Sequence, residues 1–175
     1  MEFYEVIRTR RSVRSYSDRP ITSDTLERVL GAARLAPSGS NRQPTRLILV
    51  RDPEERRALV PLCGGQQFVA QAPLVIVACG RNIHYNRGGY MGDCSVIVDV
   101  TIATDHLTLA ARAEGLGTCW IGSFDNARLK EHLGLPGDVN VVALTPLGYP
   151  KERAFSDSAD RLPLKDIVCE GRWKF

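Results

Sequence analysis

The longest run of hydrophobic positions lies between Ser95 and Ala113, where apolar residues recur in nearly every turn of a helix. They cover more than one stripe, a pattern typical of a helix buried on almost all sides rather than of an amphipathic one. The sequence therefore predicts a core helix over 93–114, roughly 33 Å long at the standard rise per residue. Asp99 and Asp105 interrupt it too often for a membrane span.

Shorter periodic runs surround this segment. Gly115 and Gly117 provide a helix stop, and the residues up to Gly122 favour an extended backbone. Three apolar runs, at 45–50, 74–79 and 139–144, are typical of buried strands. Helical patterns occupy 3–9, 22–33, a segment starting at 52, 67–71 and 126–133. Because helices and strands alternate, we expect a sheet of three or more strands flanked by helices, in the α+β or α/β range.

Composition narrows the class of protein. With 175 residues, 43% of them hydrophobic and 25% charged, the chain predicts one domain over 1–175. The formal charge of +3 gives no reason to expect nucleic acid or an anionic membrane as a partner. Five cysteines without a C-x-x-C pair, and an N-terminus without an apolar signal core, indicate a cytoplasmic protein with free thiols. The histidines and cysteines lack zinc-ligand spacing, so no metal site is expected. Cys94 and Cys119 belong to the core segment and are expected to be buried.

A basic segment, Arg10–Arg14, is the first candidate for chemistry. In an extended backbone Arg10, Ser12 and Arg14 share one face and offer two planar guanidinium groups and a hydroxyl to a phosphate or a carbonyl edge. Arg11 would then point the opposite way. The alternatives are a solvated basic turn and, with less support, a nucleic-acid contact.

Three other segments carry polar or unpartnered side chains. The loop Pro37–Gln43, which we call the amide loop, could bind the polar edge of a planar heterocycle, or it could simply turn. The glycine-rich stretch 80–92, with His84, Tyr85 and Tyr90, is expected to be a lid or substrate wall, or an inert loop. The tail 151–175 has apolar residues that it cannot bury alone, which predicts an arm on another surface or a frayed terminus.

Five motifs occur in a fixed order: R-x-S-x-R at 10–14, A-P-S-x-x-N-x-Q-P at 36–44, G-L-G-x-x-W-x-G at 115–122, G-Y-P at 148–150 and R-x-P at 161–163. In this order the chain resembles the nitroreductase-like flavoproteins, over nearly its whole length. Two departures are the threonine at position 45, where many relatives have tryptophan, and the short chain, which lacks the substrate-site insertion of longer members.

The resemblance implies an α+β nitroreductase-like fold, with a central, mostly antiparallel sheet flanked by helices around the long buried helix. It also implies a homodimer, with a C-terminal arm extending to the partner subunit and FMN at the interface. Arg10, Ser12 and Arg161 would contact the phosphate and ribityl chain, Arg14 the pyrimidine edge, and the amide loop would come from the partner. The implied cofactor contacts are Arg10, Arg11, Ser12, Arg14, Pro37, Ser38, Gly39, Asn41, Gln43, Ile121, Gly122, Ser123 and Arg161.

The activity implied is transfer of a hydride from NADH or NADPH through FMN to a nitroaromatic, quinone or similar small electron acceptor. Since flavin carries the chemistry, no catalytic acid or base is expected in the chain. The alternative function is a flavin-binding protein without nitroreductase turnover, acting as flavin store, sensor or flavin-modifying enzyme.

Overall fold

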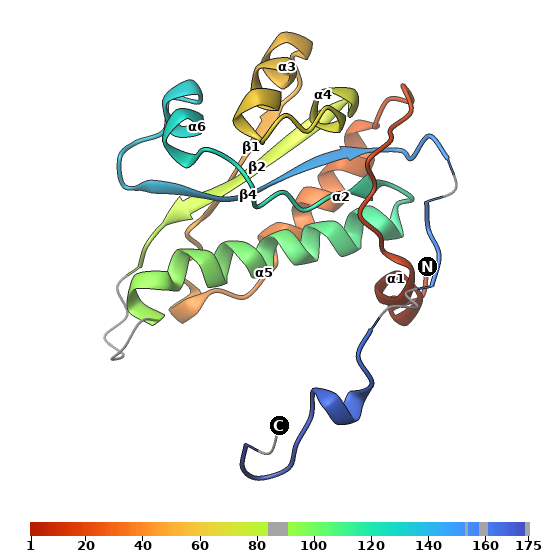
Figure 1. Cartoon of the computed structure of the whole chain (residues 1–175), viewed down its shortest axis with the longest axis vertical. Coiled ribbons are helices and arrows are strands. Elements are labelled where there is room, and N and C mark those ends of the chain that lie inside the picture. The colour runs from red at the N-terminus through yellow and green to blue at the C-terminus, as the bar shows by residue number, and fades with distance from the viewer. Residues whose placement is uncertain (84–90, 153, 158–160, 174–175) are drawn as a thin grey trace.

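Four strands form one sheet with helices on both faces (Figure 1), in a computed structural model that describes residues 1–83, 91–152, 154–157 and 161–173. The sheet order is β1-β2-β4-β3, and every neighbouring pair is antiparallel. The strands are β1 (Thr45–Val50), β2 (Leu74–Arg81), β3 (Gly117–Thr118) and β4 (Val139–Gly148). The predicted α+β class with an antiparallel sheet is confirmed.

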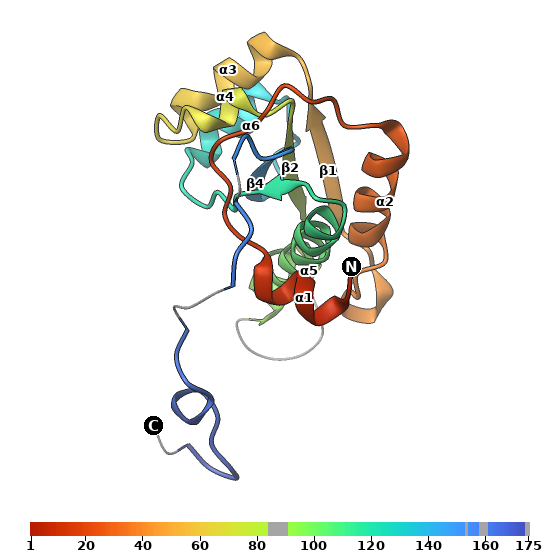
Figure 2. The same cartoon turned by 90° about the vertical axis from the view of Figure 1, so that its right-hand side faces the viewer.

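The sheet separates two helical layers, seen edge-on in Figure 2. One layer holds α3 (Pro53–Leu62), α4 (Phe68–Gln71) and α6 (Asn126–His132), and the other holds α1 (Phe3–Thr9), α2 (Ser23–Arg34) and α5 (Met91–Ala113). Two 3-10 turns complete the described elements, Gly39–Asn41 and Leu164–Asp166. Strand β2 alternates between the layers, because Val75 and Val77 pack with the first helices and Leu74 and Ile76 with the second. Burial on both faces explains its continuous apolar sequence.

Capping residues define the starts of two of the helices. The Thr22 side chain accepts a hydrogen bond from the backbone nitrogen of Thr25 at 3.3 Å, which opens α2. Asp52 accepts from the backbone of Glu54 and Glu55 at the start of α3, with Pro53 in the first turn. Such caps satisfy backbone donors that have no partner within the helix.

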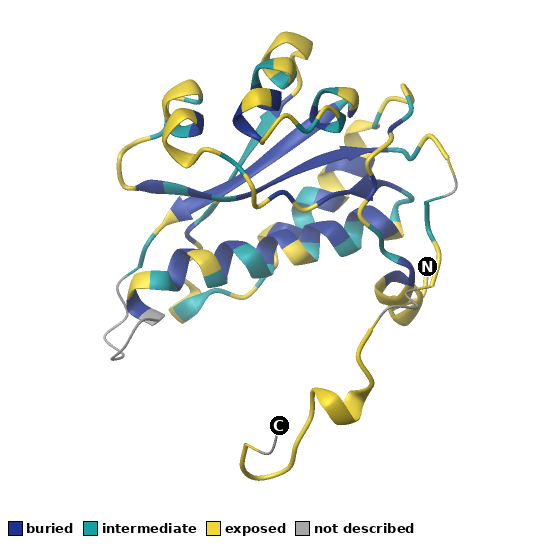
Figure 3. Ribbon diagram, viewed as in Figure 1, coloured by how far each residue is buried: buried dark blue, intermediate teal, exposed yellow. Residues whose placement is uncertain are grey.

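Helix α5 is less buried than its sequence predicts (Figure 3). Its inner side, including Val100, Leu107 and Ala111, is fully buried, whereas Ile97 is 54% exposed. The expectation of burial on nearly all sides is wrong for one copy of the chain, because one sheet and α2 cover only one side of the helix. By length and composition alone Gly92–Ala113 could cross a membrane, with a mean hydropathy of 1.3. Its packing on the sheet is equally what a soluble protein's core helix shows.

Three smaller expectations need correction. Strand β1 has the predicted bounds but is mostly half-buried, because it lies at the edge of the sheet. The third predicted strand, 139–144, continues to Gly148 as β4. Cys94 is half-buried rather than buried, since it sits in the first turns of α5 on its less covered side, while Cys119 is buried as predicted.

The lid expected within 80–92 falls on residues 84–90, which lie outside the described part of the chain.

The C-terminal tail leaves the body beside α1 and extends away from it (Figure 1). Phe155 packs against Val13 and Tyr16, so the root of the tail is held on the body. Every residue of 161–173, which we call the arm, is exposed. Its apolar side chains, exposed by 55 to 81%, are Leu162, Leu164, Ile167, Val168 and Trp173.

Candidate functional site

The basic segment crosses the chain just after the C-terminal end of α5. Gly115, with a φ of 75°, ends the helix in the left-handed conformation. The backbone nitrogen of Val13 then donates to the carbonyl of Thr118 at 2.8 Å. The crossing is close at Gly117, where an added Cβ would lie 2.6 Å from a methyl carbon of Val13. Two motifs about a hundred residues apart in sequence thus form one structural unit.

Side chains alternate from Ser12 to Arg14, as expected for an extended backbone, and the alternation ends at Ser15, which is exposed like Arg14. Val13 is buried, while Ser12 and Arg14 on either side of it are exposed. Tyr16 is buried and its hydroxyl donates to the carbonyl of Val13 at 2.6 Å. Burial raises the pKa of Tyr16 well above its ordinary value, so the phenol remains neutral. The predicted common face of Ser12 and Arg14 therefore points away from the core.

Arg11 leaves one hydrogen-bond donor unsatisfied. Its Nη1 atom donates to the carbonyl of Arg10 at 2.8 Å. Its Nη2 atom is buried and has no hydrogen-bond partner among the described residues. A buried donor without a partner is costly, and an anionic oxygen would satisfy it. With Arg10 half-buried and Ser12 and Arg14 exposed beside it, the segment offers positive charge and donors of the kind that a flavin phosphate requires.

Arg14 and Ser12 lie beside the extended chain that follows α5. The Arg14 guanidinium carbon is 5.9 Å from the centre of the Phe68 ring. Burial raises the pKa of the Cys119 thiol, while the charge of Arg14 and a hydrogen bond with Ser12 act in the opposite direction. Ile121, which is buried, exchanges backbone hydrogen bonds of 2.9 and 3.1 Å with Leu144.

Beyond Ile121 the chain emerges at the surface. Gly122 and Ser123 are exposed, so their backbone and hydroxyl are open to a ligand. Sequence reasoning missed two neighbours of this site, Phe68 and Gly64. A Cβ added to Gly64 would lie 3.8 Å from the Ser123 hydroxyl oxygen. The glycine pair at 64–65 was the available signal, since positive φ angles there mark a tight turn.

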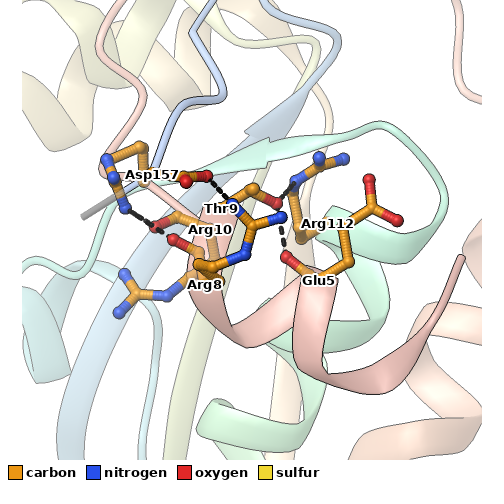
Figure 4. Close-up of polar contacts among 7 residues, drawn as sticks. Glu5, Arg8, Thr9, Arg10, Arg112 and Asp157 are labelled. Atoms are coloured by element: carbon orange, nitrogen blue, oxygen red, sulfur yellow. Dashed lines mark hydrogen bonds and ion pairs between the residues drawn. The ribbon is translucent and has the colours of Figure 1, made fainter.

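Arg112, at the end of α5, fastens α1 and the root of the tail to this site (Figure 4). Its Nε atom donates to the Thr9 hydroxyl at 2.9 Å, and its guanidinium carbon lies 4.1 Å from the centre of the Phe155 ring. Burial lowers the pKa of Arg112, and the nearby Glu5 opposes this shift. Arg8 pairs with Asp157, which adds a second tie between α1 and the tail.

The amide loop lies elsewhere in the same copy of the chain. The backbone nitrogen of Gly39 donates to Oδ1 of Asp99 at 3.1 Å, which places the loop beside the N-terminal half of α5. The basic segment lies at the other end, near Arg112. Asp99 and Arg112 are separated by roughly 20 Å along the helix at the standard rise per residue. One copy therefore does not bring the two predicted parts of the flavin site together.

Arg161 begins the arm and is exposed. The structure brings the basic segment against residues 117–119, from which the chain continues to Ile121, Gly122 and Ser123. Among the described residues, no group of three or more His, Cys, Asp and Glu is placed to hold a metal ion.

Comparisons with known proteins identify the family of the chain. The profile described as "Nitroreductase family" matches residues 7–95 and 61–149. A protein of Archaeoglobus fulgidus, named provisionally as an NADH dehydrogenase/NAD(P)H nitroreductase, is 37% identical and covers 98% of this chain and 99% of its own length. The FMN reductase [NAD(P)H] of Bacillus subtilis is 33% identical, over 90% of this chain and 68% of its own.

Solved structures agree with this likeness. The NADPH:FMN oxidoreductase of Vibrio harveyi complexed with NAD+ superimposes with a TM-score of 0.88 and 26% identity, covering 99% of this chain and 78% of that one. A nitroreductase family protein of Clostridium difficile reaches 0.83 with 30% identity, over 99% and 100% of the two chains. With most of the length matched by the profile and by a relative above 30% identity, the chain belongs to the nitroreductase family.

Proposed function

We propose that the protein is an FMN-dependent oxidoreductase that takes a hydride from NADH or NADPH and passes electrons to a nitroaromatic, quinone or similar small acceptor. The observation that carries the proposal is the packing of the basic segment on residues 117–118, together with a buried nitrogen of Arg11 that has no partner among the described residues. Relatives named as an FMN reductase and as an NADPH nitroreductase support the same reaction class.

The chain's own groups would bind and orient the flavin. Arg10, Ser12 and Arg161 would hold its phosphate and ribityl chain. Arg14 would stabilise the negative charge that the pyrimidine edge acquires on reduction, because hydrogen bonds from a guanidinium to an anionic oxygen are charge-assisted. The backbone at Gly122 would lie along the ring beside its redox-active nitrogen. Bound FMN supplies hydride transfer, so these residues serve binding and electrostatics.

We further propose that the working protein is a cytoplasmic homodimer with the flavin between its copies. The basic segment and the amide loop lie at opposite ends of α5, so a second copy is the simplest way to place both around one ring. The exposed side of α5, with Ile97, and the exposed apolar residues of the arm are surfaces that such a partner would cover. Interfaces of this kind commonly bury more than about 2,000 Å².

The absorbance spectrum of the purified protein tests the first step, because bound flavin gives visible bands. Protein that is colourless and fails to take up added FMN would rule out the proposal. The second measurement is an assay of steady NADH or NADPH oxidation with a nitroaromatic or a quinone as acceptor, which tests turnover. Flavin binding without such turnover would instead favour a flavin store, sensor or flavin-modifying enzyme.

A further inference from the structure

The amide loop has a backbone that its sequence does not favour. Ser40, Asn41 and Gln43 have φ angles of 48°, 55° and 51°, in the left-handed region that side chains other than glycine rarely adopt. Residues in this region persist only where their surroundings hold them there, and they concentrate at binding sites and active sites. The loop therefore needs contacts that fix its shape.

Some of these contacts lie within the loop. The Ser38 hydroxyl accepts a hydrogen bond from the backbone nitrogen of Gln43 at 2.9 Å, and the Gln43 side-chain amide donates to the carbonyl of Asn41 at 3.2 Å. Both bonds join exposed groups, which compete with water. They close the loop on itself, but they do not attach it to the body of the protein.

Two side chains of the body hold the loop: Arg46 on β1, whose Nη1 atom donates to the carbonyl of Gln43 at 3.0 Å at an exposed position, and Asp99 on α5. Its carboxylate oxygen Oδ1 accepts the backbone N–H of Gly39 at 3.1 Å, and the residue is only 4% exposed. A cavity of about 210 Å³ separates part of the loop from the helix, and its lining includes Ser38, Gln43, Asp99 and Ala103. The loop thus rests on α5 across a partly open space, and this partly buried hydrogen bond spans the two.

The position of Asp99 is unexpected for packing alone. Val96 and Val100 beside it, and Ala103 one turn further on, are buried apolar residues. A carboxylate in such surroundings is costly unless it is hydrogen-bonded, and an aliphatic residue would continue the apolar surface of the helix. The acid is therefore explained by what it binds rather than by what it packs against.

We propose that Asp99 is a positioning residue that holds the amide loop in the shape needed to contact the flavin of the second copy. This inference rests on the proposed function. Asp99, in the N-terminal half of α5 in one copy, would thereby help to build the flavin site at the C-terminal end of α5 in the other copy.

The first experiment compares two replacements of Asp99 in the purified full-length protein. Asp99→Ala removes the acceptor, whereas Asp99→Asn keeps an acceptor oxygen in the same shape. We expect the dissociation constant of FMN to rise about tenfold in the alanine variant, which corresponds to loss of one hydrogen bond to a charged group, and by less than about threefold in the asparagine variant. Asp24→Ala, an exposed acid on α2, is the control and should bind FMN like the wild type.

A second pair of variants removes the donor, in case the alanine at 99 impairs folding. Gly39→Pro deletes the backbone N–H, and proline suits the first position of a helical turn after the extended Ser38. Gly39→Ala keeps the N–H and is the matched control. The proline variant should lose FMN affinity about tenfold relative to the alanine variant. Equal affinities within this pair, or within the Asp99 pair, would overturn the inference.

Mixed dimers test whether the loop of one copy contributes to the flavin site of the other copy. A purely structural role of Asp99 within its own chain would not produce such an effect. Asp99→Ala and Arg14→Ala chains are co-expressed with different affinity tags. In a mixed dimer one site would carry both lesions and the other neither. Among randomly paired dimers, about a quarter of all flavin sites would then be intact. If the mixed dimers bind no more FMN than the two single variants do, Asp99 and Arg14 serve the same site from one chain.

The outcomes separate the two proposals. Wild-type protein that binds no FMN refutes the proposed function itself. Wild-type protein that binds FMN, with Asp99→Ala and Gly39→Pro binding it equally well, refutes only the positioning role.

Discussion

The two ends of α5 hold different segments by opposite charges. At the C-terminal end a buried cation, Arg112, binds Thr9 and the ring of Phe155, and so fastens α1 and the root of the tail. In the N-terminal half a buried anion, Asp99, binds the backbone of Gly39. The first end joins segments distant in sequence into a compact unit. The second holds one strained loop.

This difference shows how one long helix can serve two sites. A site assembled at the Arg112 end of one copy and completed by the loop at the Asp99 end of another would place two equivalent sites about a two-fold axis. The helix would act as a spacer that fixes the distance between them. The predictions below disturb the Arg112 end or the rest of the body and leave the Asp99 end intact, from the largest expected effect to the smallest.

Deleting residues 162–175 should have the largest effect, because it removes the exposed apolar residues of the arm that starts from the Arg112 end. We expect the truncated protein to sediment as a monomer without flavin, since a shared site cannot survive loss of the dimer. The measurement is sedimentation with absorbance read at protein and flavin wavelengths. A truncated monomer that keeps its flavin would contradict the shared site.

Replacing Arg14 with alanine should weaken FMN binding about tenfold to a hundredfold, the effect of losing a hydrogen bond to a charged group. Arg11→Ala should have a smaller effect, because Nη1 of Arg11 is already bound to the carbonyl of Arg10 and only its Nη2 atom is left to bind an anion. Titration of FMN-free protein followed by flavin fluorescence measures both. Arg128→Ala, an exposed arginine on α6, is the control, and equal losses at 11 and 14 would refute the extended arrangement.

Gly117→Ala should lower the free energy of unfolding by about 1–3 kcal/mol, the usual cost of overpacking. The new Cβ would lie 2.6 to 2.8 Å from three atoms of Val13 and push the basic segment away. Gly137→Ala is the matched control, because nothing lies within 4 Å of a Cβ there. Urea unfolding compares the two, and a Gly117 variant as stable as the Gly137 variant would show that the crossing adapts freely.

The smallest expected effect is on the pH dependence of the free energy of unfolding. It compares a thiol in the buried body with one in the exposed arm. Burial raises the pKa of Cys63 to about 11. The folded state therefore favours the neutral thiol, so its contribution to stability is complete below the unfolded pKa of about 8.5 and is lost as the pH rises towards 11. In urea unfolding between pH 8 and pH 10.5, Cys63→Ala should lose less stability than the wild type. Cys169→Ala, in the exposed arm, should follow the wild type.

Thiol labelling gives an independent check of the same contrast. In the native protein at neutral pH, Cys169 should react quickly with a bulky reagent, while Cys63, Cys79 and Cys119 stay protected, because all three are buried. Fast labelling of a buried thiol would mean that the body opens more readily than its packing indicates.

Much of the fold could be predicted from local pattern. The bounds of β1 and the capped starts of α2 and α3 follow from apolar runs, Thr22 and Asp52, which act over a few residues. The exposure of Ile97 and the half-burial of β1 could not be predicted, because burial depends on which other elements cover a surface. Phe68 was missed for a similar reason, since its place beside Arg14 arises from folding across more than fifty residues.

The apolar pattern by itself determined the helix and strand types and limited the class to α+β or α/β. The five ordered motifs, through the family they resemble, indicated the antiparallel α+β class and the residues proposed to hold the flavin. Local preferences and motif spacing are properties of the chain and need no partner. Only the tertiary structure decided that the basic segment lies against Gly117 and that the amide loop lies about 20 Å away, on Asp99. Distances between remote segments are set by packing on a common core, which no local pattern encodes.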